Sequence, residues 1–440
     1  MRKHVTAALA GLMALALAAC GSGTGGGSAS PGATDGGAQS GDKIGEGKEL
    51  TVWIMEGTAP SAEDFFKEVG ADFKEQTGAD VKVEFVPWSA AKDKFATAIA
   101  GGQTPDVAEL GFTMTPEYAD AGALMDMTDQ LAAAGLDKGF IEAATAASTV
   151  DGKVYGAPWY AGLRAFLYNK EIFEKAGIAQ PPTNWAELQD AVAKIKQSQP
   201  DVIPFPVLGS SEFTVYPWIY GAGGDIATLD GDKWTATINS PEAQEGLTFY
   251  TDLALKHGSS TSAAATWNEK DALTNFKNGN VGMILNGSWT PATIKQDSPE
   301  LYEKLGAFPI PGKESGLAGS VIGGSHLSIF ENSEHKELAW EFVKLMTTGE
   351  KAKAWGEASN FFPCDTAGIE ALSQSTDPLV APFAQQMAEA GRTVPATPAF
   401  GQIQSKKTVV SMMQSILTGK ADVKAATDAA NAEMQSVFEG

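Results

Sequence analysis

The stretch ELTVWIM, residues 49–55, is the first clear signal of the fold in this chain of 440 residues. Its apolar side chains are typical of a strand buried in a sheet. Residues 64–76 follow with phenylalanines and a valine at helical spacing, and Gly78 is a stop signal for that helix. Apolar and charged residues alternate over 81–85, which predicts a second strand.

The same alternation of strand and helix continues along the chain. Residues 90–100 are predicted to form a helix, and residues 106–110 a third strand. This order predicts a parallel sheet with helices on its faces. Ligands of such sheets bind beyond the carboxyl ends of the strands, where this chain carries Glu56, Trp88, Phe112 and Thr113.

A second informative stretch is VGMILNGSWT, residues 281–290, which follows a helix predicted over 269–277. We expect a buried strand over 281–285 and a break at Asn286 and Gly287. Trp289 then stands on a corner, an unusual place for the largest apolar side chain unless it faces something other than the core. A later amphipathic helix is predicted over 335–348.

The N-terminus carries a basic start and a small-apolar run over 7–19. That run is too short for a mature membrane span and predicts a signal peptide over residues 1–19. It ends in LAAC, which resembles the lipobox of bacterial lipoproteins, in which the cysteine, here Cys20, is lipidated. An ordinary signal peptide with an incidental cysteine is the alternative. The Gly/Ser-rich residues 20–47 are expected to form a flexible tether.

Charge and residue counts limit the class of ligand. The formal net charge of −22 disfavours nucleic acid and anionic lipid as partners. Arginines at positions 164 and 392 are the only ones after the signal peptide, so a strongly anionic ligand is not expected. The histidines lack metal-ligand spacing and Cys364 is isolated, so we expect no metal site and no cofactor, and we interpret Cys364 as a small buried hydrophobe.

Seven stretches, in order, carry a family resemblance. They are TPDVAEL (104–110), EYADAGALMDMT (117–128), YGAPWYAGLRAFLYNKEIFEKAGI (155–178), PPTNWAEL (181–188), WIYGAGGDI (218–226), ALTNFKNGNVGMILNGSW (272–289) and HKELAWEFVKLMTT (335–348). From about residue 48 onward the chain resembles a solute-binding protein of an ABC importer. More narrowly, it resembles the family of the maltodextrin-binding protein and other oligosaccharide receptors.

That resemblance implies an α/β, two-lobe periplasmic-binding-protein-like fold with a ligand cleft between the lobes and several crossing segments. We expect residues 48–157 and 320–360 to form the first lobe, and 158–319 and 361–440 the second. It further implies a monomeric receptor that delivers an oligosaccharide to membrane permease subunits by lobe closure. Such a receptor would sit on the outer face of the cytoplasmic membrane and touch the membrane through its lipid anchor only.

Sugars present a face of C–H groups and a rim of hydroxyls, so we expect aromatic rings for stacking and polar groups for the rim. Tryptophans within strand or helix patterns, such as Trp53, Trp185, Trp340 and Trp355, are interpreted as core residues. The predicted ligand-binding residues, in part carried over from the resemblance, are Glu56, Trp88, Phe112, Thr113, Trp159, Tyr160, Trp218, Trp267, Asn286, Trp289, Ser325 and Phe400. For Asn286 a purely structural role in the turn is the alternative.

Other classes of protein remain open at this point. A secreted glycoside hydrolase would also combine aromatic residues with paired carboxylates, and an adhesive, structural or other carbohydrate-active lipoprotein is a further alternative. We find no nucleophile elbow, phosphate loop or zinc motif, and we expect no enzymatic activity. Among sugars, the resemblance favours a chitin-derived di- or oligosaccharide, ahead of maltose-type and cellobiose-type ligands.

Overall fold

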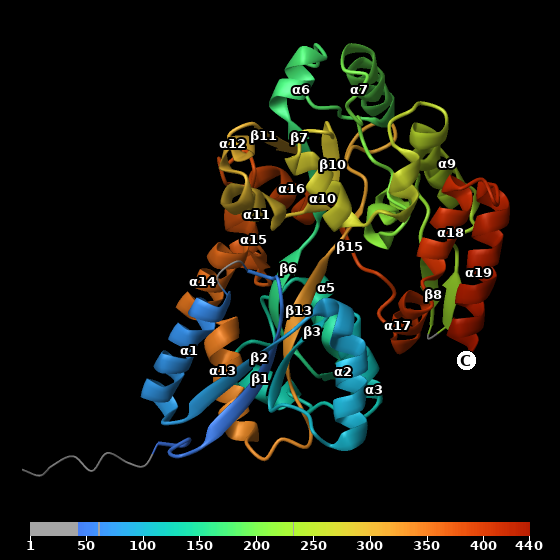
Figure 1. Cartoon of the computed structure of the whole chain (residues 1–440). Coiled ribbons are helices and arrows are strands. Elements are labelled where there is room, and N and C mark those ends of the chain that lie inside the picture. The colour runs from blue at the N-terminus through green and yellow to red at the C-terminus, as the bar shows by residue number, and fades with distance from the viewer. Residues whose placement is uncertain (1–42, 60–61, 232) are drawn as a thin grey trace, which may run out of the picture. The chain divides into compact units, whose positions relative to one another are not determined.

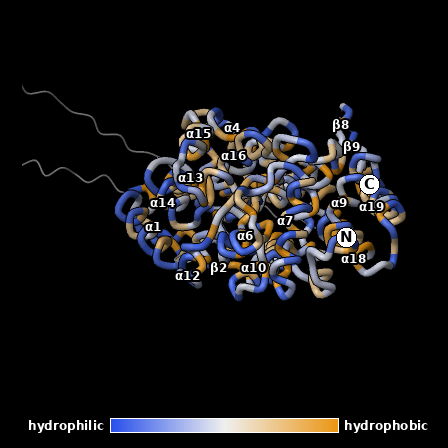
Figure 2. Tube along the Cα trace, turned by 90° about the horizontal axis from the view of Figure 1, so that it is seen from above, coloured by the Kyte–Doolittle hydropathy of each residue, from blue (hydrophilic) through white to orange (hydrophobic). Residues whose placement is uncertain are grey.

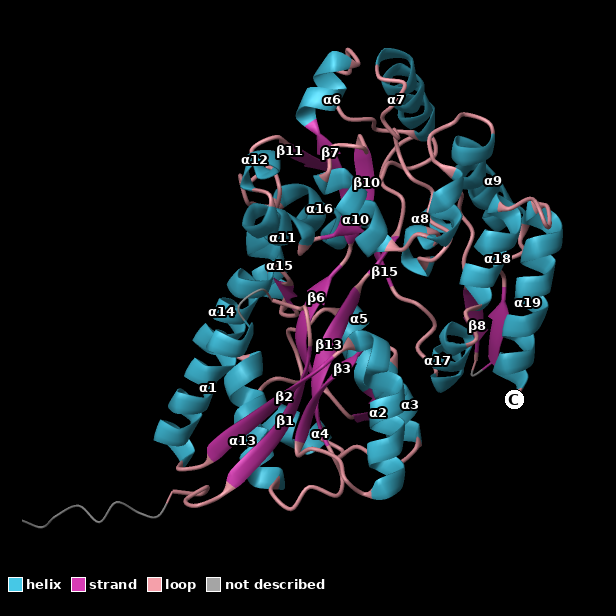
Figure 3. Cartoon of the chain, viewed as in Figure 1, coloured by secondary structure: helices cyan, strands magenta, loops and turns pink. Residues whose placement is uncertain are grey.

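The first lobe is built on a mixed six-stranded sheet (Figures 1 and 3). The computed structural model describes residues 43–440 apart from residues 60, 61 and 232. The predicted signal peptide, Cys20 and most of the predicted tether therefore lie outside the described residues. In spatial order the strands are β14 (Phe362–Pro363), β6 (Ala157–Gly162), β13 (Gly323–Ile329), β3 (Val107–Gly111), β1 (Glu49–Met55) and β2 (Asp80–Val86).

The predicted strand and helix alternation is confirmed in this lobe. Strand β1 pairs in parallel with β2 and β3, whereas β13 is antiparallel to both β3 and β6. One face of the sheet packs against α1 (Ala62–Thr77), α13 (Lys336–Thr347) and α14 (Gly349–Ser359). The other face packs against α2 (Trp88–Gly101) and α3 (Met114–Asp120). Smaller elements complete the lobe: α4 (Thr128–Ala133), α5 (Glu142–Ser148), β4 (Thr149–Val150) and β5 (Lys153–Val154).

The second lobe has a three-stranded antiparallel sheet in the order β10 (Met283–Gly287), β7 (Arg164–Asn169) and β11 (Leu305–Phe308). Its helices include α6 (Lys170–Lys175), α7 (Trp185–Ser198), α8 (Tyr216–Gly221), α9 (Pro241–Leu255), α10 (Glu269–Lys277), α16 (Ala381–Ala390), α18 (Thr408–Leu417) and α19 (Val423–Glu439). The predicted α10 is confirmed, and Asn268 starts it with a capping box that satisfies backbone donors of the first turn. Seen from above, hydrophobic residues concentrate toward the interior and hydrophilic residues toward the outer edge (Figure 2).

The remaining described elements are short. They are the 3₁₀ helices η1 (Glu212–Thr214) and η2 (Ser262–Thr266), the hairpin β8 (Ala227–Asp230) and β9 (Lys233–Ala236), the strands β12 (Ser320–Val321) and β15 (Gly391–Arg392), and the helices α11 (Thr290–Asp297), α12 (Pro299–Tyr302), α15 (Thr366–Ser373) and α17 (Pro398–Ser405).

The chain passes between the lobes through paired strands. Strand β6 of the first sheet continues into β7 of the second with Leu163 alone between them. Strand β12 leads into β13 across Ile322, and β13 pairs with β6, so these two crossings run side by side (Figure 1). A third crossing follows β14, because α16 then packs on β7 and β11. These features confirm the predicted two-lobe α/β fold with several crossing segments.

Two expected boundaries differ from the structure. The strand expected over 281–285 lies at Met283–Gly287, because Asn286 and Gly287 continue the pairing with β7. The expected first-lobe limit at residue 157 falls at the start of β6, and β6 bonds to β13 in the first sheet. Hydrogen bonding therefore assigns residues 157–162 to the first lobe, and β14 joins the same sheet from the C-terminal side.

Trp218, predicted to face the cleft, belongs to the core of the second lobe instead. Its side chain is fully buried, stacks on Tyr250 with ring centroids 5.0 Å apart, and donates its indole N–H to the carbonyl of Thr214. Its place on the short helix α8, covered by α9, decides this.

We expect Trp218→Ala to lower the free energy of unfolding by about 3–5 kcal/mol, because it removes a large buried ring and leaves a cavity. Denaturant unfolding of the ligand-free protein measures this. A variant with unchanged stability would show that the ring is not part of the core.

Candidate ligand-binding cleft

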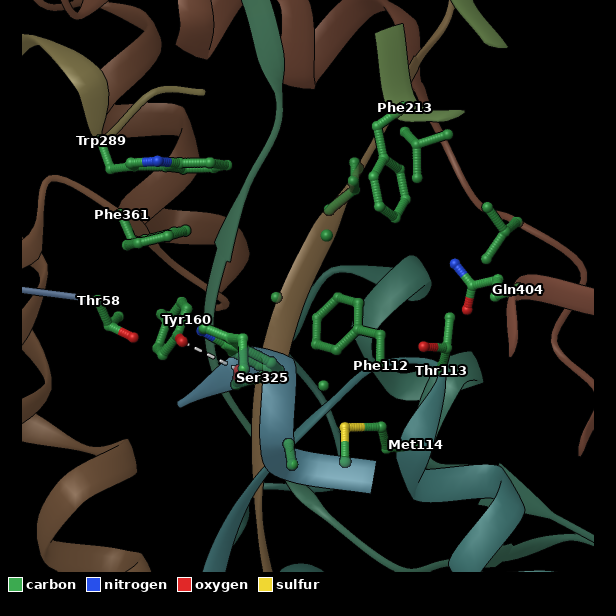
Figure 4. Close-up of a pocket in the computed structure, with 18 of the residues that line it drawn as sticks. Thr58, Phe112, Thr113, Met114, Tyr160, Phe213, Trp289, Ser325, Phe361 and Gln404 are labelled. Carbon is green, nitrogen blue, oxygen red and sulfur yellow. Dashed lines mark hydrogen bonds between the residues drawn. The ribbon is translucent and has the colours of Figure 1, made fainter. Parts of the chain in front are cut away.

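A cavity of about 610 Å³ lies where the crossing strands join the two lobes. Its volume is within the range of about 300–1,000 Å³ that is usual for small-molecule sites. Its lining comes from the ends of first-lobe strands, the crossing segments and the second lobe, as Figure 4 shows. Strand ends supply side chains that are exposed to a ligand while their backbones stay fixed in the sheets.

One wall of the cleft is a pair of stacked aromatic rings. The rings of Trp289 and Phe361 lie 4.7 Å apart and nearly parallel, at 16° (Figure 4). Gly287 makes this placement possible, since a Cβ atom there would lie 2.2 Å from the indole. The indole of Trp289 therefore folds back over the end of β10 and lines the cleft. This explains why a tryptophan occupies the corner after the strand.

Trp88 supplies an aromatic surface from the first lobe. It is the first residue of α2 and is 46% exposed, which is high for so large a side chain. Its ring also lies over Gly111 at the end of β3, where a Cβ atom would come within 3.3 Å. An exposed ring held against a glycine backbone is suited to stacking on a flat ligand.

The floor of the cleft carries hydroxyl groups above a buried acid. Tyr160 and Ser325, from adjacent positions of β6 and β13, line the cavity and are both nearly fully buried. Beneath them Glu109 accepts hydrogen bonds from the Tyr160 hydroxyl, from Ser325 Oγ at 2.8 Å and from the Met55 amide at 2.9 Å. Burial raises the pKa of Glu109 to about 7, and the three hydrogen bonds limit that rise.

The charges that line the cavity are paired. Among the described lining residues, Lys92 and Arg164 are the charged ones. Arg164 makes a two-pronged ion pair with Glu269 at 3.2 Å, and its guanidinium lies over the rings of Phe213 and Trp289. Lys92 lies 3.3 Å from Glu117. Neither cation is left to balance an anionic ligand, so the cleft suits a neutral, polar molecule.

The buried ring of His326 holds the Phe112 side chain in place. The ring of Phe112 stacks on His326 at 4.5 Å between centroids. Burial lowers the pKa of His326 to about 4, so the imidazole is neutral at physiological pH. Its Nε2 donates to the carbonyl of Ala144, and its Nδ1 accepts from Thr115. The histidine therefore acts as a structural support for a cleft residue.

The structure brings half of the predicted ligand-binding residues together in this cavity. These are Trp88, Phe112, Thr113, Tyr160, Trp289 and Ser325. Glu56 is exposed next to the cleft, whose edge is formed by Gly57 and Thr58 instead. Trp267 packs against second-lobe hydrophobic residues and does not line the cavity.

Three further predictions are corrected by packing. Trp159 is buried in the first-lobe core, where it stacks on Trp355 at 4.8 Å. Phe400 is buried in the second-lobe core. Asn286 shapes the turn, because its side chain accepts from Gly287 and Thr290 and donates to the carbonyl of Glu269.

Several lining residues were not predicted from the sequence. They include Thr58, Lys92, Arg164, Phe213, Phe361 and Gln404. Arg164 directly follows Leu163, the residue between β6 and β7. Its place in the stretch that passes between the lobes could have identified it as a cleft residue. Phe213 lies in the short 3₁₀ helix η1, and Phe361 lies in an irregular segment just before β14. The sequence offered no comparable signal for either residue.

No group of three or more His, Cys, Asp or Glu side chains in the described part of the chain could hold a metal ion. Cys364 is a free, buried thiol there, and none of the helices described is long and apolar enough to cross a bilayer.

Sequence and structure comparisons identify the family. Residues 59–353 match the model of the bacterial extracellular solute-binding protein family. The diacetylchitobiose binding protein DasA of Streptomyces coelicolor is 30% identical over 431 residues, which is 97% of this chain and 96% of that protein. The arabinooligosaccharide-binding protein of Halalkalibacterium halodurans is 25% identical and covers 72% of this chain and 71% of its own.

Solved structures agree with this. A solute-binding protein of an ABC transporter from Thermotoga lettingae, bound with α-D-tagatose, has a TM-score of 0.78 at 27% identity, covering 89% of this chain and all of its own. The GacH receptor of Streptomyces glaucescens, solved with and without acarbose, has a TM-score of 0.78 at 25% identity over 89% of this chain and 98% of its own. The chain belongs to the bacterial extracellular solute-binding protein family, and the predicted family is confirmed.

The buried acid gives a pH prediction. The pKa of Glu109 is higher in the folded protein, about 7, than the ordinary value of 4.5 for a glutamate carboxyl group, so the folded state binds the proton more tightly. Its protonation stabilises the fold fully below pH 4.5, and this contribution is lost as the pH rises through 7. The loss is roughly 3 kcal/mol, at 1.36 kcal/mol per pKa unit.

We therefore expect the unfolding free energy of Glu109→Gln, measured relative to wild type, to increase by that amount between pH 4.5 and 8. Urea unfolding at several pH values measures it. Glu68→Gln is the matched control for removing a carboxylate that is exposed rather than buried. A flat difference for Glu109→Gln would contradict the raised pKa of Glu109.

Proposed function

We propose that this protein is an extracellular receptor for a neutral oligosaccharide, which it delivers to an ABC importer. The observation that carries the proposal is the combination, in one cavity, of aromatic rings from both lobes with a hydroxyl-bearing floor and paired charges. Rings can cover the C–H faces of sugars, and hydroxyls and amides can bind the rim. Family members include ones named for binding diacetylchitobiose, arabinooligosaccharides and maltooligosaccharides.

Binding would act through lobe closure. Helix α17, whose Phe400 belongs to the second-lobe core, also packs on α3 of the first lobe. Lys92 on α2 donates to the Gly401 carbonyl at 2.9 Å and to Ser405 at 2.7 Å. Such contacts form only when the lobes approach, so a ligand that touches both lobes would shift the equilibrium toward the closed state.

A chitin-derived di- or oligosaccharide is the ligand that we favour. Support comes from the similarity to the diacetylchitobiose binding protein, which extends over nearly the whole length of both chains. The paired charges of Arg164 and Glu269 also suit an uncharged, N-acetylated sugar better than an acidic one. Maltose-type and cellobiose-type ligands are the competing outcomes of a binding screen.

We further propose that the protein breaks no bond in its ligand. Most glycoside hydrolases use two carboxyl groups at the scissile bond. No Asp or Glu is among the described residues that line the cavity. Glu109 lies below the floor, where its oxygens are occupied by Tyr160, Ser325 and Met55.

We expect Trp289→Ala to weaken oligosaccharide binding about thirtyfold. Stacking that covers roughly 80 Å² of apolar surface contributes about 2 kcal/mol, and 1.4 kcal/mol corresponds to a factor of ten. Calorimetric titration with diacetylchitobiose, maltose and cellobiose measures it. Trp234 is a matched control, because it stacks on Phe438 and does not line the cavity, so Trp234→Ala should leave affinity unchanged.

Two results would contradict the receptor proposal. One is a Trp289→Ala variant with unchanged affinity and a large loss of stability, which would make the indole a core residue. The other is the appearance of shorter sugars after long incubation of the wild type with any ligand that binds, which would favour a hydrolase.

The anchor is a separate proposal. We propose that Cys20, which lies outside the described residues, is the lipidated N-terminus of the mature protein and holds it on the outer face of the cytoplasmic membrane. Cys20→Ala should release the protein from the membrane fraction or leave it unprocessed. Fractionation followed by mass spectrometry of the N-terminus measures this, and a processed variant that stays with membranes would overturn it.

A further inference from the structure

Glu109 is a fully buried carboxyl group that lies directly under two cleft hydroxyls, and no Lys, Arg or His among the described residues pairs with it. The groups that hydrogen-bond to it are neutral: the Tyr160 hydroxyl, Ser325 Oγ and the Met55 amide. A buried acid is costly to keep in a core unless it does something that a neutral residue could not. Its position below the floor of the cleft suggests that it acts on the two floor hydroxyls.

The direction of these hydrogen bonds depends on the charge of Glu109. An ionised carboxylate can only accept, so the Tyr160 proton points to Glu109. The single proton of Ser325 Oγ points either to Glu109 at 2.8 Å or to the Tyr160 hydroxyl at 3.0 Å (Figure 4). In both cases the two hydroxyls have only lone pairs left for the cavity. A protonated carboxyl group donates to one of these hydroxyls, and that hydroxyl can turn its own proton toward the cleft.

We propose that Glu109 is a positioning residue that sets the hydrogen-bond direction of Tyr160 and Ser325, so that with an ionised carboxylate the floor accepts hydrogen bonds from the O–H or N–H donors of a ligand. This inference rests on the proposed function, since it takes the cavity to be the ligand site. The chemistry selected is a donor-bearing neutral sugar, such as one with an amide N–H.

Other titratable groups near the cluster do not replace Glu109 in this role. The strands that surround it carry Glu49 on β1, Tyr160 on β6 and His326 on β13, and Glu56 follows β1. Tyr160 is already a partner, and burial raises its pKa well above the ordinary value, so it keeps its proton. His326 stays neutral with a pKa of about 4 and bonds to Thr115 and Ala144.

Helix α14, which packs on Tyr160, places no unpaired buried charge next to Glu109. Its Trp355 packs on Tyr160. Lys351 pairs with Asp72 of α1 at 2.6 Å, and the other charged side chains of α14 are exposed, namely Glu350, Lys353 and Glu357. Glu56 is exposed as well. We therefore assign a pH-dependent change in the hydrogen bonding of Tyr160 and Ser325 to the titration of Glu109.

The first arm of the test needs no ligand. Tyrosine labelled with ¹³C at Cζ reports the hydrogen-bond state of its hydroxyl in an NMR spectrum, and Tyr160→Phe identifies the Tyr160 signal. We expect that signal to shift with pH, with a midpoint near 7, the pKa of Glu109. Glu109→Gln should abolish the shift, because glutamine is always neutral and can both donate and accept, whereas the exposed Glu68→Gln should preserve it. A Tyr160 signal that does not change between about pH 5.5 and 8.5 would overturn the proposal.

The second arm measures the affinity for diacetylchitobiose across the same pH range. Wild type should bind roughly two- to tenfold more tightly at the alkaline end, the worth of one hydrogen bond. Glu109→Gln should show no pH dependence and should match wild type at the acidic end. A flat or reversed profile in wild type would overturn the inference while leaving the receptor proposal intact. If diacetylchitobiose, maltose and cellobiose all fail to bind, the receptor proposal fails, and the NMR arm still decides the role of Glu109.

Discussion

The strands that pass between the two sheets constrain everything else in the cleft. Strand β6 becomes β7 across one residue, Leu163, and β12 becomes β13 across Ile322. Because β6 and β13 are hydrogen-bonded to each other, the two crossings form one ribbon. The ribbon passes through the space between the lobes, and Tyr160, Arg164 and Ser325 on or next to it line the cavity.

Charge pairing gives the cleft its neutral character. Arg164 would be a strong anion ligand if it were free, yet Glu269 engages it through two hydrogen bonds and Ser211 donates to the same carboxylate. Two aromatic rings then cover the guanidinium, which orients it further. The arrangement leaves the aromatic surfaces and the hydroxyl floor as the groups that can recognise a ligand. The buried carboxyl group of Glu109 lies below that floor and sets the hydrogen-bond direction of the floor hydroxyls.

The tryptophans show how packing separates residues that look alike in sequence. Trp88 and Trp159 both lie at or next to strands of the first sheet. Trp88 opens a helix at the carboxyl end of β2 and stays 46% exposed, whereas Trp159 points to the face covered by α1 and α14 and is 3% exposed. In β6 a register shift at Trp159 interrupts the pairing with β13, and Trp159 and its neighbour Tyr160 both pack against Trp355 of α14. The covering helices therefore decide which tryptophan reaches the cleft. These covering helices are far from β6 along the chain, so the residues next to each tryptophan do not predict which one reaches the cleft.

The sequence by itself determined the alternation of strand and helix in the first lobe, the helix over 269–277 in the second, and the corner at Trp289. Each depends on spacing, capping or turn chemistry within a few residues. The family resemblance carried the two-lobe fold. Only the tertiary structure decided that Trp159, Trp218 and Phe400 are core residues and that Phe213 and Phe361 are not. It also placed Glu109, an ordinary strand residue in the sequence, under the cleft floor. These outcomes depend on contacts between different helices and strands, such as Trp218 with Tyr250 and Glu109 with Ser325, and burial of a side chain is a property of those contacts rather than of its neighbours in the chain.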